Sequence, residues 1–347
     1  MNFSYKSYAS EVLFGRDKFL ELPTRLKDVE NLLIIGSKRV DPIVAELQSK
    51  LPKTQVTRID NIIQHVPVSL VEEALLLLKD SKPDMILAIG GGSAIGLAKA
   101  IALETSLPII AAVTTYSGSE QTPIWGKSTS EGKVTGRTDI VLPRLVIYDP
   151  KLTAELPKHI TVTSAMNAMA HLVEAVYAPS RNPITTMQAL QGMSTIKYGL
   201  ERIIELGQLD DEANEELLYG AYLGGKCLAE VDMSLHHKTA HVLGGKYQLD
   251  HAKVHTVLLP HVLAYQWPYL TSDIQADFQS ALGKNPSQYL KYLTKNAGAE
   301  TDLCSIGFKI EQVDEAVTLM LSNPYPNVAP LSVEKLKKMV LNACKSS

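Results

Sequence analysis

The sequence predicts an α/β domain over residues 1–155, followed by an all-helical domain over residues 156–347. Three observations predict this division. The chain has 347 residues, which is long for a single hydrophobic core. Apolar runs alternate with amphipathic stretches up to about residue 150, and from about residue 160 only long helical patterns follow, separated by short polar breaks.

Four segments in the first part predict strands, and all but the second are continuous apolar runs. They cover residues 31–36, 54–59, 83–90 and 107–114. Helical patterns follow three of them, over residues 41–51, 69–82 and 93–104, and Ser69 with Glu72 has the spacing of a capping box at the start of the second helix. Strands that are apolar on both faces and alternate with helices predict a parallel sheet covered by helices.

Composition excludes several classes of protein. The apolar fraction is 45% and the charged fraction 20%, as in an ordinary soluble globular protein. A net charge of −3 gives no reason to expect nucleic acid as a partner. The cysteines, Cys227, Cys304 and Cys344, form no CxxC pair, and we find no signal-peptide pattern and no apolar run that would span a membrane. These features predict a soluble, cytoplasmic protein.

A glycine turn follows the third predicted strand. In "AIGGGSAIGLAKA" the glycines would let a phosphate approach the backbone, and the first N–H groups of the following helix would face its charge. The spacing is not GxGxxG, so the ordinary dinucleotide fingerprint is absent. A tight strand–helix turn without a ligand is the alternative interpretation.

A second loop, "TTYSGSEQTPIWG", follows the fourth predicted strand and is rich in hydroxyl and small side chains. Open α/β sheets bind their ligands at the carboxyl ends of strands. Either loop alone could be an ordinary surface turn. Two such loops at neighbouring strand ends favour a nucleotide site.

The second half holds an unusual concentration of histidine. Six of the nine histidines fall within "HHKTAHVLGGKYQLDHAKVHTVLLPH", namely His236, His237, His241, His251, His255 and His261. The pair His237 and His241 is spaced i, i+4, as are His251 and His255, so each pair shares a helix face. Asn167 and His171 have the same spacing in "SAMNAMAHLVEAVY". A lone histidine is more often a core residue, but this concentration predicts a polar site.

A metal site is one interpretation of these side chains. Three histidines and a carboxylate suit a divalent ion such as Fe²⁺ or Zn²⁺. The carboxylate is missing, because Asn167 carries a neutral amide. The metal interpretation therefore stays open but weakened.

These motifs, in this order, resemble the iron-containing alcohol dehydrogenase superfamily. The resemblance spans nearly the whole chain and is carried most specifically by "TTYSGSEQTPIWG", "TGRTDIVLPRLVIYDP" and "HHKTAHVLGGKYQLDHAKVHTVLLPH". More closely, the sequence is similar to the maleylacetate reductase branch. The resemblance implies a dehydroquinate synthase-like fold with a dinucleotide-binding domain, a helical domain and an active site between them.

The resemblance also implies roles for particular positions. The superfamily's metal ligands, one aspartate and three histidines, fall on Asn167, His171, His237 and His251, of which only the first departs from the pattern. Metal-dependent relatives often carry aspartate where Gly96 stands. Maleylacetate reductases are similar in lacking the acidic ligand and in working without metal. We therefore expect no bound metal.

The implied reaction is reduction of the carbon–carbon double bond of 2-maleylacetate, giving 3-oxoadipate, with NADH or NADPH as reductant. An enolate formed in this way can be stabilised by hydrogen-bond donors in place of a metal, and a histidine is suited to deliver the proton that follows. We expect His241 to be that proton donor, with His171, His237 and His251 lining the pocket and Tyr116 as a further donor. The remaining three histidines of the cluster are expected to serve packing only.

Cofactor-binding residues are expected at the two loops and at the end of the first predicted strand. By position or by resemblance they are Ser37, Gly91, Gly92, Ser93, Thr114, Thr115, Ser119 and Lys133. Ser37 does not repel a 2′-phosphate, and Lys38 or Arg39 could attract one, so we expect NADPH to be accepted as well as NADH. A small dianionic unsaturated keto acid requires cations nearby, and the candidates are Arg137, Lys238, Lys246 and Lys253.

Three other functions remain open on the sequence. The protein could be a metal-dependent alcohol or polyol dehydrogenase that tolerates Asn167, a reductase of another unsaturated keto acid, or a non-catalytic nucleotide-binding protein. The retained histidines argue against the last. Relatives suggest a homodimer, and the resemblance implies a role in the degradation of aromatic compounds.

Overall fold

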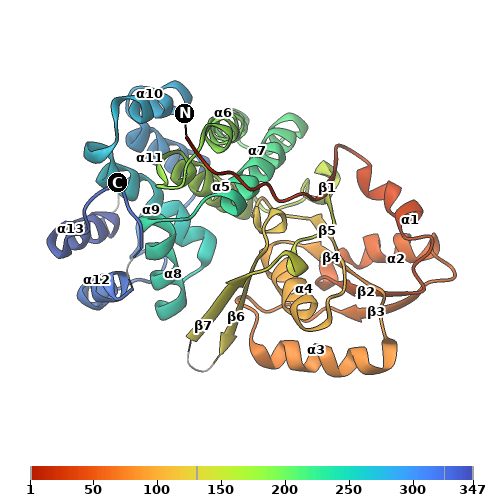
Figure 1. Cartoon of the computed structure of the whole chain (residues 1–347). Coiled ribbons are helices and arrows are strands. Elements are labelled where there is room, and N and C mark those ends of the chain that lie inside the picture. The colour runs from red at the N-terminus through yellow and green to blue at the C-terminus, as the bar shows by residue number, and fades with distance from the viewer. Residues whose placement is uncertain (1, 130–131, 324, 346–347) are drawn as a thin grey trace. The chain divides into compact units, whose positions relative to one another are not determined.

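The computed structural model describes residues 2–129, 132–323 and 325–345, with the side chain of Lys133 outside the described part. By its internal contacts the chain forms two compact units (Figure 1). One is Ser7–Leu156, and the other joins residues 2–6 to the chain from Pro157 onward. The domain limits 1–155 and 156–347 stay a prediction, because compactness does not show which segments fold independently.

A six-stranded parallel sheet forms the core of the first unit. Its order is β1-β8-β5-β4-β2-β3. The strands are β1 (Glu11–Phe14), β2 (Asn31–Ile35), β3 (Gln55–Ile59), β4 (Met85–Gly90), β5 (Ile109–Val113) and β8 (Leu145–Tyr148). Four of them, β2 to β5, coincide with the predicted strands, and the predicted parallel α/β architecture is confirmed.

The strands β1 and β8 were not predicted. Each has four residues, too few for a periodic pattern to stand out from the loops around it. They pair with each other from Glu11 opposite Leu145 to Phe14 opposite Tyr148, and β8 also pairs with β5. The edge of the sheet therefore depends on contacts between segments more than 130 residues apart in the chain.

Helices and short 3-10 turns connect the strands. They are η1 (Lys18–Glu21), α1 (Leu22–Arg25), η2 (Lys38–Val40), α2 (Asp41–Ser49), α3 (Val68–Ser81), α4 (Gly92–Thr105), η3 (Ser119–Gln121), η4 (Asp139–Val141) and η5 (Pro150–Leu152). The predicted capping box at Ser69 and Glu72 is wrong. Extended backbone at Pro67 places the start of α3 at Val68, so Ser69 lies inside the first turn and no side chain caps the helix.

An antiparallel hairpin follows the second hydroxyl-rich loop. Its strands are β6 (Ile124–Thr129) and β7 (Gly132–Arg137), paired from Ile124 opposite Arg137 to Thr129 opposite Gly132. A Cβ atom at Gly136 would lie 2.6 Å from Trp125 Cζ2, so the indole ring covers the glycine backbone. The hairpin is therefore held by this close approach as well as by its hydrogen bonds.

The second unit is helical. Its helices are α5 (Lys158–Tyr177), α6 (Pro183–Leu206), α7 (Asp211–Glu230), α8 (Leu235–Tyr247), α9 (His251–Gln266), α10 (Ser272–Leu282), α11 (Pro286–Ala297), α12 (Val313–Leu321) and α13 (Val333–Ala343), with 3-10 turns η6 (Trp267–Tyr269) and η7 (Ile310–Gln312). The described residues from 157 onward contain no strand, which confirms the all-helical prediction.

Helix α5 lies at the centre of this unit and packs against α6, α7 and α9 (Figure 1). Every residue from Thr161 to Tyr177 is buried. Because polar residues on such a helix cannot reach bulk water, any that lacks a partner inside the protein is costly and marks a place for a ligand or water. None of the helices in the described ranges combines the length and hydropathy that a bilayer crossing requires.

Candidate active site

Helix α5 directs three polar side chains into the interior of the helical unit. Asn167, His171 and Glu174 are 5%, 3% and 0% exposed. Their spacing of four and then three residues places them on one helix face. We did not single out Glu174 from the sequence, although this i, i+4, i+7 spacing in an otherwise apolar helix was the signal that could have identified it.

Helices α8 and α9 supply the other members of a cluster of imidazole rings. We call His171, His236, His237, His241, His251 and His255 the histidine cluster. His255 lies at its centre, with ring centroids 4.8 Å from His236, 4.8 Å from His237 and 4.4 Å from His251. His255 was expected to serve packing only, but the structure makes it the ring that connects the others.

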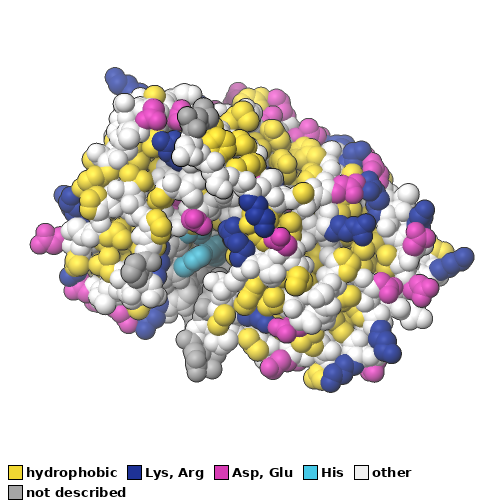
Figure 2. All heavy atoms as spheres, viewed as in Figure 1, with side chains coloured by type: hydrophobic (Ala, Val, Ile, Leu, Met, Phe, Trp, Pro, Cys, Tyr) yellow, Lys and Arg dark blue, Asp and Glu magenta, His cyan; other side chains and the backbone are white. Residues whose placement is uncertain are grey.

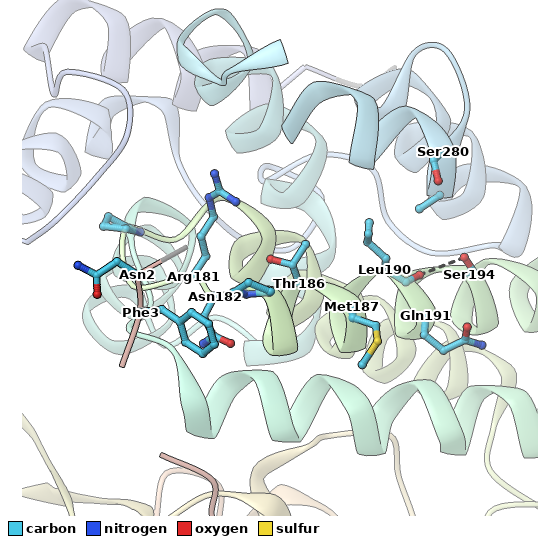
Figure 3. Close-up of a pocket in the computed structure, with 13 residues that line it drawn as sticks. Asn2, Phe3, Arg181, Asn182, Thr186, Met187, Leu190, Gln191, Ser194 and Ser280 are labelled. Carbon is cyan, nitrogen blue, oxygen red and sulfur yellow. Dashed lines mark hydrogen bonds between the residues drawn. The ribbon is translucent and has the colours of Figure 1, made fainter. Parts of the chain in front are cut away.

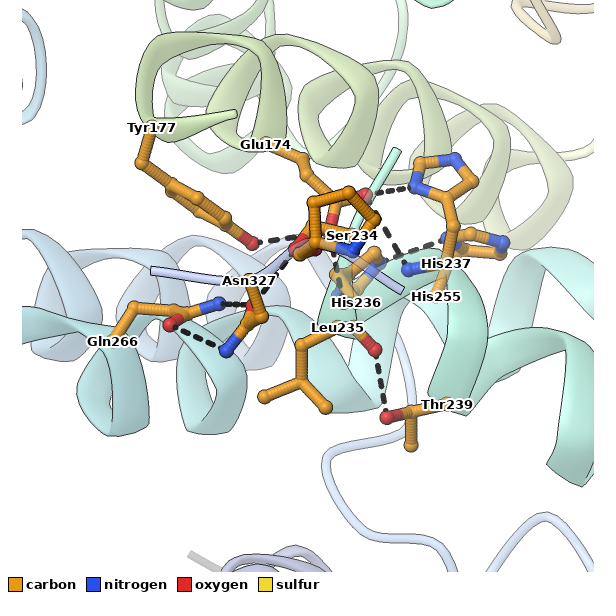
Figure 4. Close-up of polar contacts among 11 residues, drawn as sticks. Glu174, Tyr177, Ser234, Leu235, His236, His237, Thr239, His255, Gln266 and Asn327 are labelled. Carbon is orange, nitrogen blue, oxygen red and sulfur yellow. Dashed lines mark hydrogen bonds and ion pairs between the residues drawn. The ribbon is translucent and has the colours of Figure 1, made fainter. Parts of the chain in front are cut away.

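Glu174 fixes the start of α8 and the orientation of His237 (Figure 4). Its carboxylate accepts the backbone N–H of His236 at 2.8 Å and that of His237 at 3.4 Å, and it is hydrogen-bonded to His237 Nδ1. The Tyr177 hydroxyl donates to the same carboxylate at 3.3 Å. Burial raises the pKa of Glu174, but the charge and hydrogen bond of His237 outweigh burial and hold that pKa below its ordinary value.

The histidine cluster contains several buried ring nitrogens that have no hydrogen-bond partner among the described residues. They are His171 Nδ1, His236 Nδ1, His237 Nε2 and His255 Nε2. Buried polar atoms are normally satisfied, so unsatisfied nitrogens gathered in one place mark a position for a polar ligand or water. A hydrogen bond between two of the rings joins His236 Nε2 and His255 Nδ1 at 2.8 Å.

The buried rings resist protonation. Burial, followed by the neighbouring imidazoles, lowers the pKa of His171 and of His255 well below the ordinary value. Burial also lowers the pKa of His236 to about 3, although Glu174 acts in the opposite direction. These three rings are therefore neutral at pH 7, and they offer one donor and one acceptor each.

His241 and His261 differ from the buried rings. His241 is exposed, with its ring centroid 6.0 Å from that of His237 and 6.2 Å from that of His251. Figure 2 shows histidine side chains reaching the surface in the region where Figure 1 places α8. His261 lies outside the cluster, and burial together with Lys291 lowers its pKa to about 4.

A second polar network braces the start of α8. Ser234, the residue before the helix, donates to Pro326 O at 2.6 Å and to Asn327 Oδ1 at 2.7 Å. Asn327 is in turn hydrogen-bonded to Gln266 at the end of α9 (Figure 4). The positions of His236 and His237 are thus fixed from two sides, by Glu174 and by this network.

The described residues do not fit a divalent metal ion in this arrangement. No three His, Cys, Asp or Glu side chains of the described ranges converge in a way that could hold one. The rings of His171 and His237 are stacked, with centroids 5.1 Å apart and an interplanar angle of 26°. The nearby side chain at position 167 is a neutral amide.

In the first unit the structure brings the predicted cofactor loops together. Gly91 precedes α4, and a Cβ atom there would lie 2.6 Å from Thr115 Oγ1. A Cβ at Gly92 would lie 3.9 Å from Ser119 Oγ, and the Thr114 N–H donates to Gly90 O at 3.1 Å. Bare backbone, hydroxyl groups and the N–H groups at the start of a helix fit a pyrophosphate. Ser93 lies in the first turn of α4.

Three other predicted residues have different outcomes. Tyr116 is fully buried, and burial raises the pKa of its phenol above the ordinary range. Its role as a donor to the substrate stays a prediction, and its burial argues against that role. The side chain of Lys133 lies outside the described residues. Ser37 directly precedes η2, at the end of β2. Arg58 was not predicted. Its Nη2 donates to Gly36 O at 3.1 Å and to Asp41 Oδ1 at 2.8 Å, beside Ser37.

The candidate cations for a dianionic substrate are engaged in different ways. Lys246 is paired with Glu315 at 3.0 Å, and Lys253 is paired with Glu300. The Lys238 ammonium lies 5.9 Å from the centre of the Tyr325 ring. Arg137 Nη1 donates to the Tyr8 hydroxyl at 3.3 Å. Carboxylate partners already neutralise Lys246 and Lys253, so Lys238 is the best candidate among the three lysines.

A separate hollow of about 860 Å³ lies in the helical unit, between the N-terminal segment, α6 and α10 (Figure 3). Phe3, Met187 and Thr186 are among its lining residues, and no member of the histidine cluster is. Its one charged lining residue, Arg181, lies 3.6 Å from Asp273. No histidine of the cluster therefore lines the hollow, and we assign it no role.

Comparison with known proteins identifies the family of the chain. Residues 9–150 match the family described as iron-containing alcohol dehydrogenase, and residues 161–344 match the C-terminal part of the Fe-containing alcohol dehydrogenase family. The chain belongs to the iron-containing alcohol dehydrogenase family.

Within that family it is similar to proteins named maleylacetate reductase. The protein from Pseudomonas sp. (strain P51) is 41% identical over 346 residues, covering 99% of this chain and 98% of the relative. The crystal structure of maleylacetate reductase from Rhizobium sp. strain MTP-10005 superposes with a TM-score of 0.92 at 34% identity, covering 99% of this chain and 98% of that one. The enzyme from Agrobacterium tumefaciens gives a TM-score of 0.93 at 33% identity, covering 99% and 98%.

We predict that Glu174→Gln destabilises the helical unit by about 2–4 kcal/mol, because an amide cannot accept all three N–H groups and leaves buried donors unsatisfied. Tyr177→Phe is the matched control, since it removes a 3.3 Å contact to the same carboxylate. It should cost about 1 kcal/mol or less. Urea unfolding followed by circular dichroism measures both. Equal losses in the two variants would contradict the role given to Glu174.

We also predict that the free energy of unfolding rises with pH up to about 6.5. The folded-state pKa of His171, His236, His255 and His261 lies below the ordinary value, so in this window the unfolded chain binds more protons than the folded one. Each histidine adds a slope of up to about 1.4 kcal/mol per pH unit. Urea unfolding at pH 5, 6, 7 and 8 tests this, and His261→Gln should reduce the slope. A flat profile between pH 5 and 7 would refute it.

Proposed function

We propose that the protein reduces the carbon–carbon double bond of 2-maleylacetate to give 3-oxoadipate, using NADH or NADPH. The observation that carries this proposal is the similarity to maleylacetate reductases along 99% of the chain. The buried histidine cluster agrees with it, because its unsatisfied nitrogens offer hydrogen bonds to a polar substrate. The alternative of a metal-dependent alcohol or polyol dehydrogenase has less support, because a neutral amide stands at position 167.

The first unit holds the cofactor in this proposal. Gly91, Gly92 and Ser93 bind the pyrophosphate through backbone N–H groups, and the hydroxyl groups of Thr115 and Ser119 line the same turn. When bound, NAD(P)H supplies a hydride to the alkene carbon β to the ketone. Ser37 and the neighbouring cation Arg58 do not repel a 2′-phosphate, which supports acceptance of both NADH and NADPH.

The helical unit stabilises the negative charge that develops on the ketone oxygen. His237 is hydrogen-bonded through Nδ1 to Glu174, so its Nε2 is the atom available to substrate. This nitrogen faces the negative charge that develops on the enolate oxygen, while Glu174 fixes the orientation of the ring. His171, which stacks on His237, and His251 line the same pocket in this proposal.

His241 delivers the proton that completes the reaction. It is the exposed member of the histidine cluster, so it can exchange protons with solvent, whereas the buried rings resist protonation. The proton goes to the carbon next to the ketone, as the enolate collapses to the saturated keto acid. A histidine in water-accessible surroundings suits this task at neutral pH.

Turnover without a metal is part of the proposal. An enolate is far less basic than the alkoxide formed by alcohol dehydrogenases, so hydrogen-bond donors can stabilise it without a Lewis acid. The neutral amide of Asn167 supports this, as does the lack of a metal-holding group of three His, Cys, Asp or Glu among the described residues. The family as a whole is described as iron-containing, so its name does not support metal independence.

We also propose a substrate class, an oligomeric state and a cellular role. The substrate is a small dianion, for which Lys238 and Arg137 are the candidate cationic contacts. The protein works as a homodimer in the cytoplasm, in the degradation of aromatic compounds, and it has neither nucleic acid nor membrane as a partner. These statements rest on the family resemblance and on composition.

We predict that purified protein oxidises NADH when given freshly prepared maleylacetate, and that the rate persists after exhaustive EDTA treatment. The absorbance at 340 nm and metal analysis of the same sample provide the measurement. Activity that disappears on chelation and returns only with Fe²⁺ or Zn²⁺ would favour the metal-dependent dehydrogenase instead.

We predict that His241→Gln lowers kcat by about 10²–10⁴-fold, the usual contribution of a general acid, while KM for NADH changes little. His261→Gln is the matched control, because this histidine lies outside the cluster, and it should retain kcat within about threefold. Steady-state kinetics at saturating maleylacetate compare the two. If His241→Gln keeps wild-type kcat, another group supplies the proton.

A further inference from the structure

A buried lysine in the α/β unit has no part in the mechanism above. Lys99 lies in α4, eight residues after Gly91, and is 1% exposed. Burying an ammonium group is costly unless fixed partners replace water. A methionine or leucine could fill a core position of α4 without that cost, so we infer that the Lys99 ammonium group has a specific role.

The partners of Lys99 all belong to one loop. Its Nζ donates to Ser119 O at 2.6 Å, to Thr122 O at 2.6 Å and to Thr122 Oγ1 at 2.9 Å, and it lies 3.0 Å from Ile124 O. These oxygens span η3 and the first residue of β6. Short contacts from one nitrogen to several oxygens are the pattern of charge-assisted hydrogen bonds. Lys99 thus ties this loop to α4.

Glu120 anchors the same loop from the other side. It is fully buried, accepts the Tyr148 hydroxyl at 2.8 Å and lies 3.3 Å from Ser117 Oγ. Burial lowers the pKa of Lys99 to about 7, while Glu120 acts in the opposite direction, so the two groups interact inside the unit. The loop is therefore fixed by a buried lysine and a buried carboxyl group.

The fixed loop places hydroxyl groups beside the glycine turn. A Cβ at Gly92 would lie 3.8 Å from Ser117 Oγ and 3.9 Å from Ser119 Oγ, and these two hydroxyls are 3.4 Å apart. The loop thus stands next to the first N–H groups of α4. Because Ser119 itself accepts the Lys99 hydrogen bond through its carbonyl, a change at Lys99 acts directly on the residue that faces the turn.

We propose that Lys99 is a positioning residue for the cofactor: it holds the loop of residues 117–124 against the start of α4, so that backbone N–H groups and the Ser117 and Ser119 hydroxyls together bind the dinucleotide pyrophosphate. This inference rests on the NAD(P)H-dependent reaction proposed above. It assigns to Lys99 an effect on cofactor affinity and none on the chemical step.

The test is direct binding of NADH, measured by its fluorescence, with ADP and AMP as competitors. Lys99→Met should weaken NADH and ADP binding at least tenfold, about the effect of one lost charge-assisted hydrogen bond. AMP, which has no pyrophosphate, should bind within about threefold of its wild-type affinity. In steady-state assays KM for NADH should rise while kcat stays within about threefold.

Two further variants keep the test decisive. Thr122→Val keeps the shape of the side chain but removes the hydroxyl that accepts from Lys99 at 2.9 Å and donates to Ser119 O at 2.9 Å, so it should weaken NADH binding by a smaller factor in a protein that still folds. Lys127→Met is the matched control, because it removes a lysine bonded to Glu104 at 2.6 Å outside the loop contacts, and it should bind NADH as wild type does.

Unchanged NADH affinity in a folded Lys99→Met variant would overturn the inference and leave the proposed reaction intact. If Lys99→Met does not fold, unchanged affinity in Thr122→Val overturns it instead. A wild-type protein that binds no NADH would overturn both the inference and the proposed function.

Discussion

The contact between Glu174 and the start of α8 organises the helical unit. A fully buried carboxylate accepts two backbone N–H groups and one imidazole, and so joins α5 to α8 at the point where His236 and His237 begin the helix. His255 of α9 then packs between His237 and His251. A buried Glu174 carboxylate without a partner would strongly destabilise the folded state, so the carboxylate and the histidines depend on each other.

The same constraint shapes the proposed chemistry. Glu174 engages Nδ1 of His237 and leaves Nε2 free to meet a ligand, while burial keeps the other rings neutral. A pocket made of neutral donors and one charge-supported imidazole suits a delocalised enolate better than a localised alkoxide. The neutral side chain of Asn167 agrees with that choice, since it adds no negative charge to a site that receives one.

The sequence predicted the parts of the fold that have strong periodicity. The alternation of strand and helix patterns located β2 to β5, and long helical patterns predicted the second unit. It did not reveal β1 and β8, because four-residue strands acquire their pairing only from partners far along the chain. The capping box failed because backbone geometry at Pro67, which spacing does not encode, sets the start of α3.

In the candidate site, too, local sequence patterns did not reveal what depends on tertiary packing. Helical spacing identified His171, His237 and His241, but it could not rank His255, whose central place depends on how α8 and α9 pack. Glu174 was not predicted, and its full burial and its contacts with the start of α8 depend on how α5 and α8 pack. The burial of Tyr116 and the loop contacts of Lys99 likewise follow from tertiary packing that no local pattern records.

The position of the transferred hydride distinguishes this account from its rivals. NADH carrying deuterium at the transferring position should be incubated with maleylacetate and the product analysed by NMR. We expect a product that keeps its ketone and carries deuterium on the methylene carbon β to it. Deuterium on a carbinol carbon would show reduction of the carbonyl group, and it would contradict the assignment of the histidine cluster to enolate chemistry.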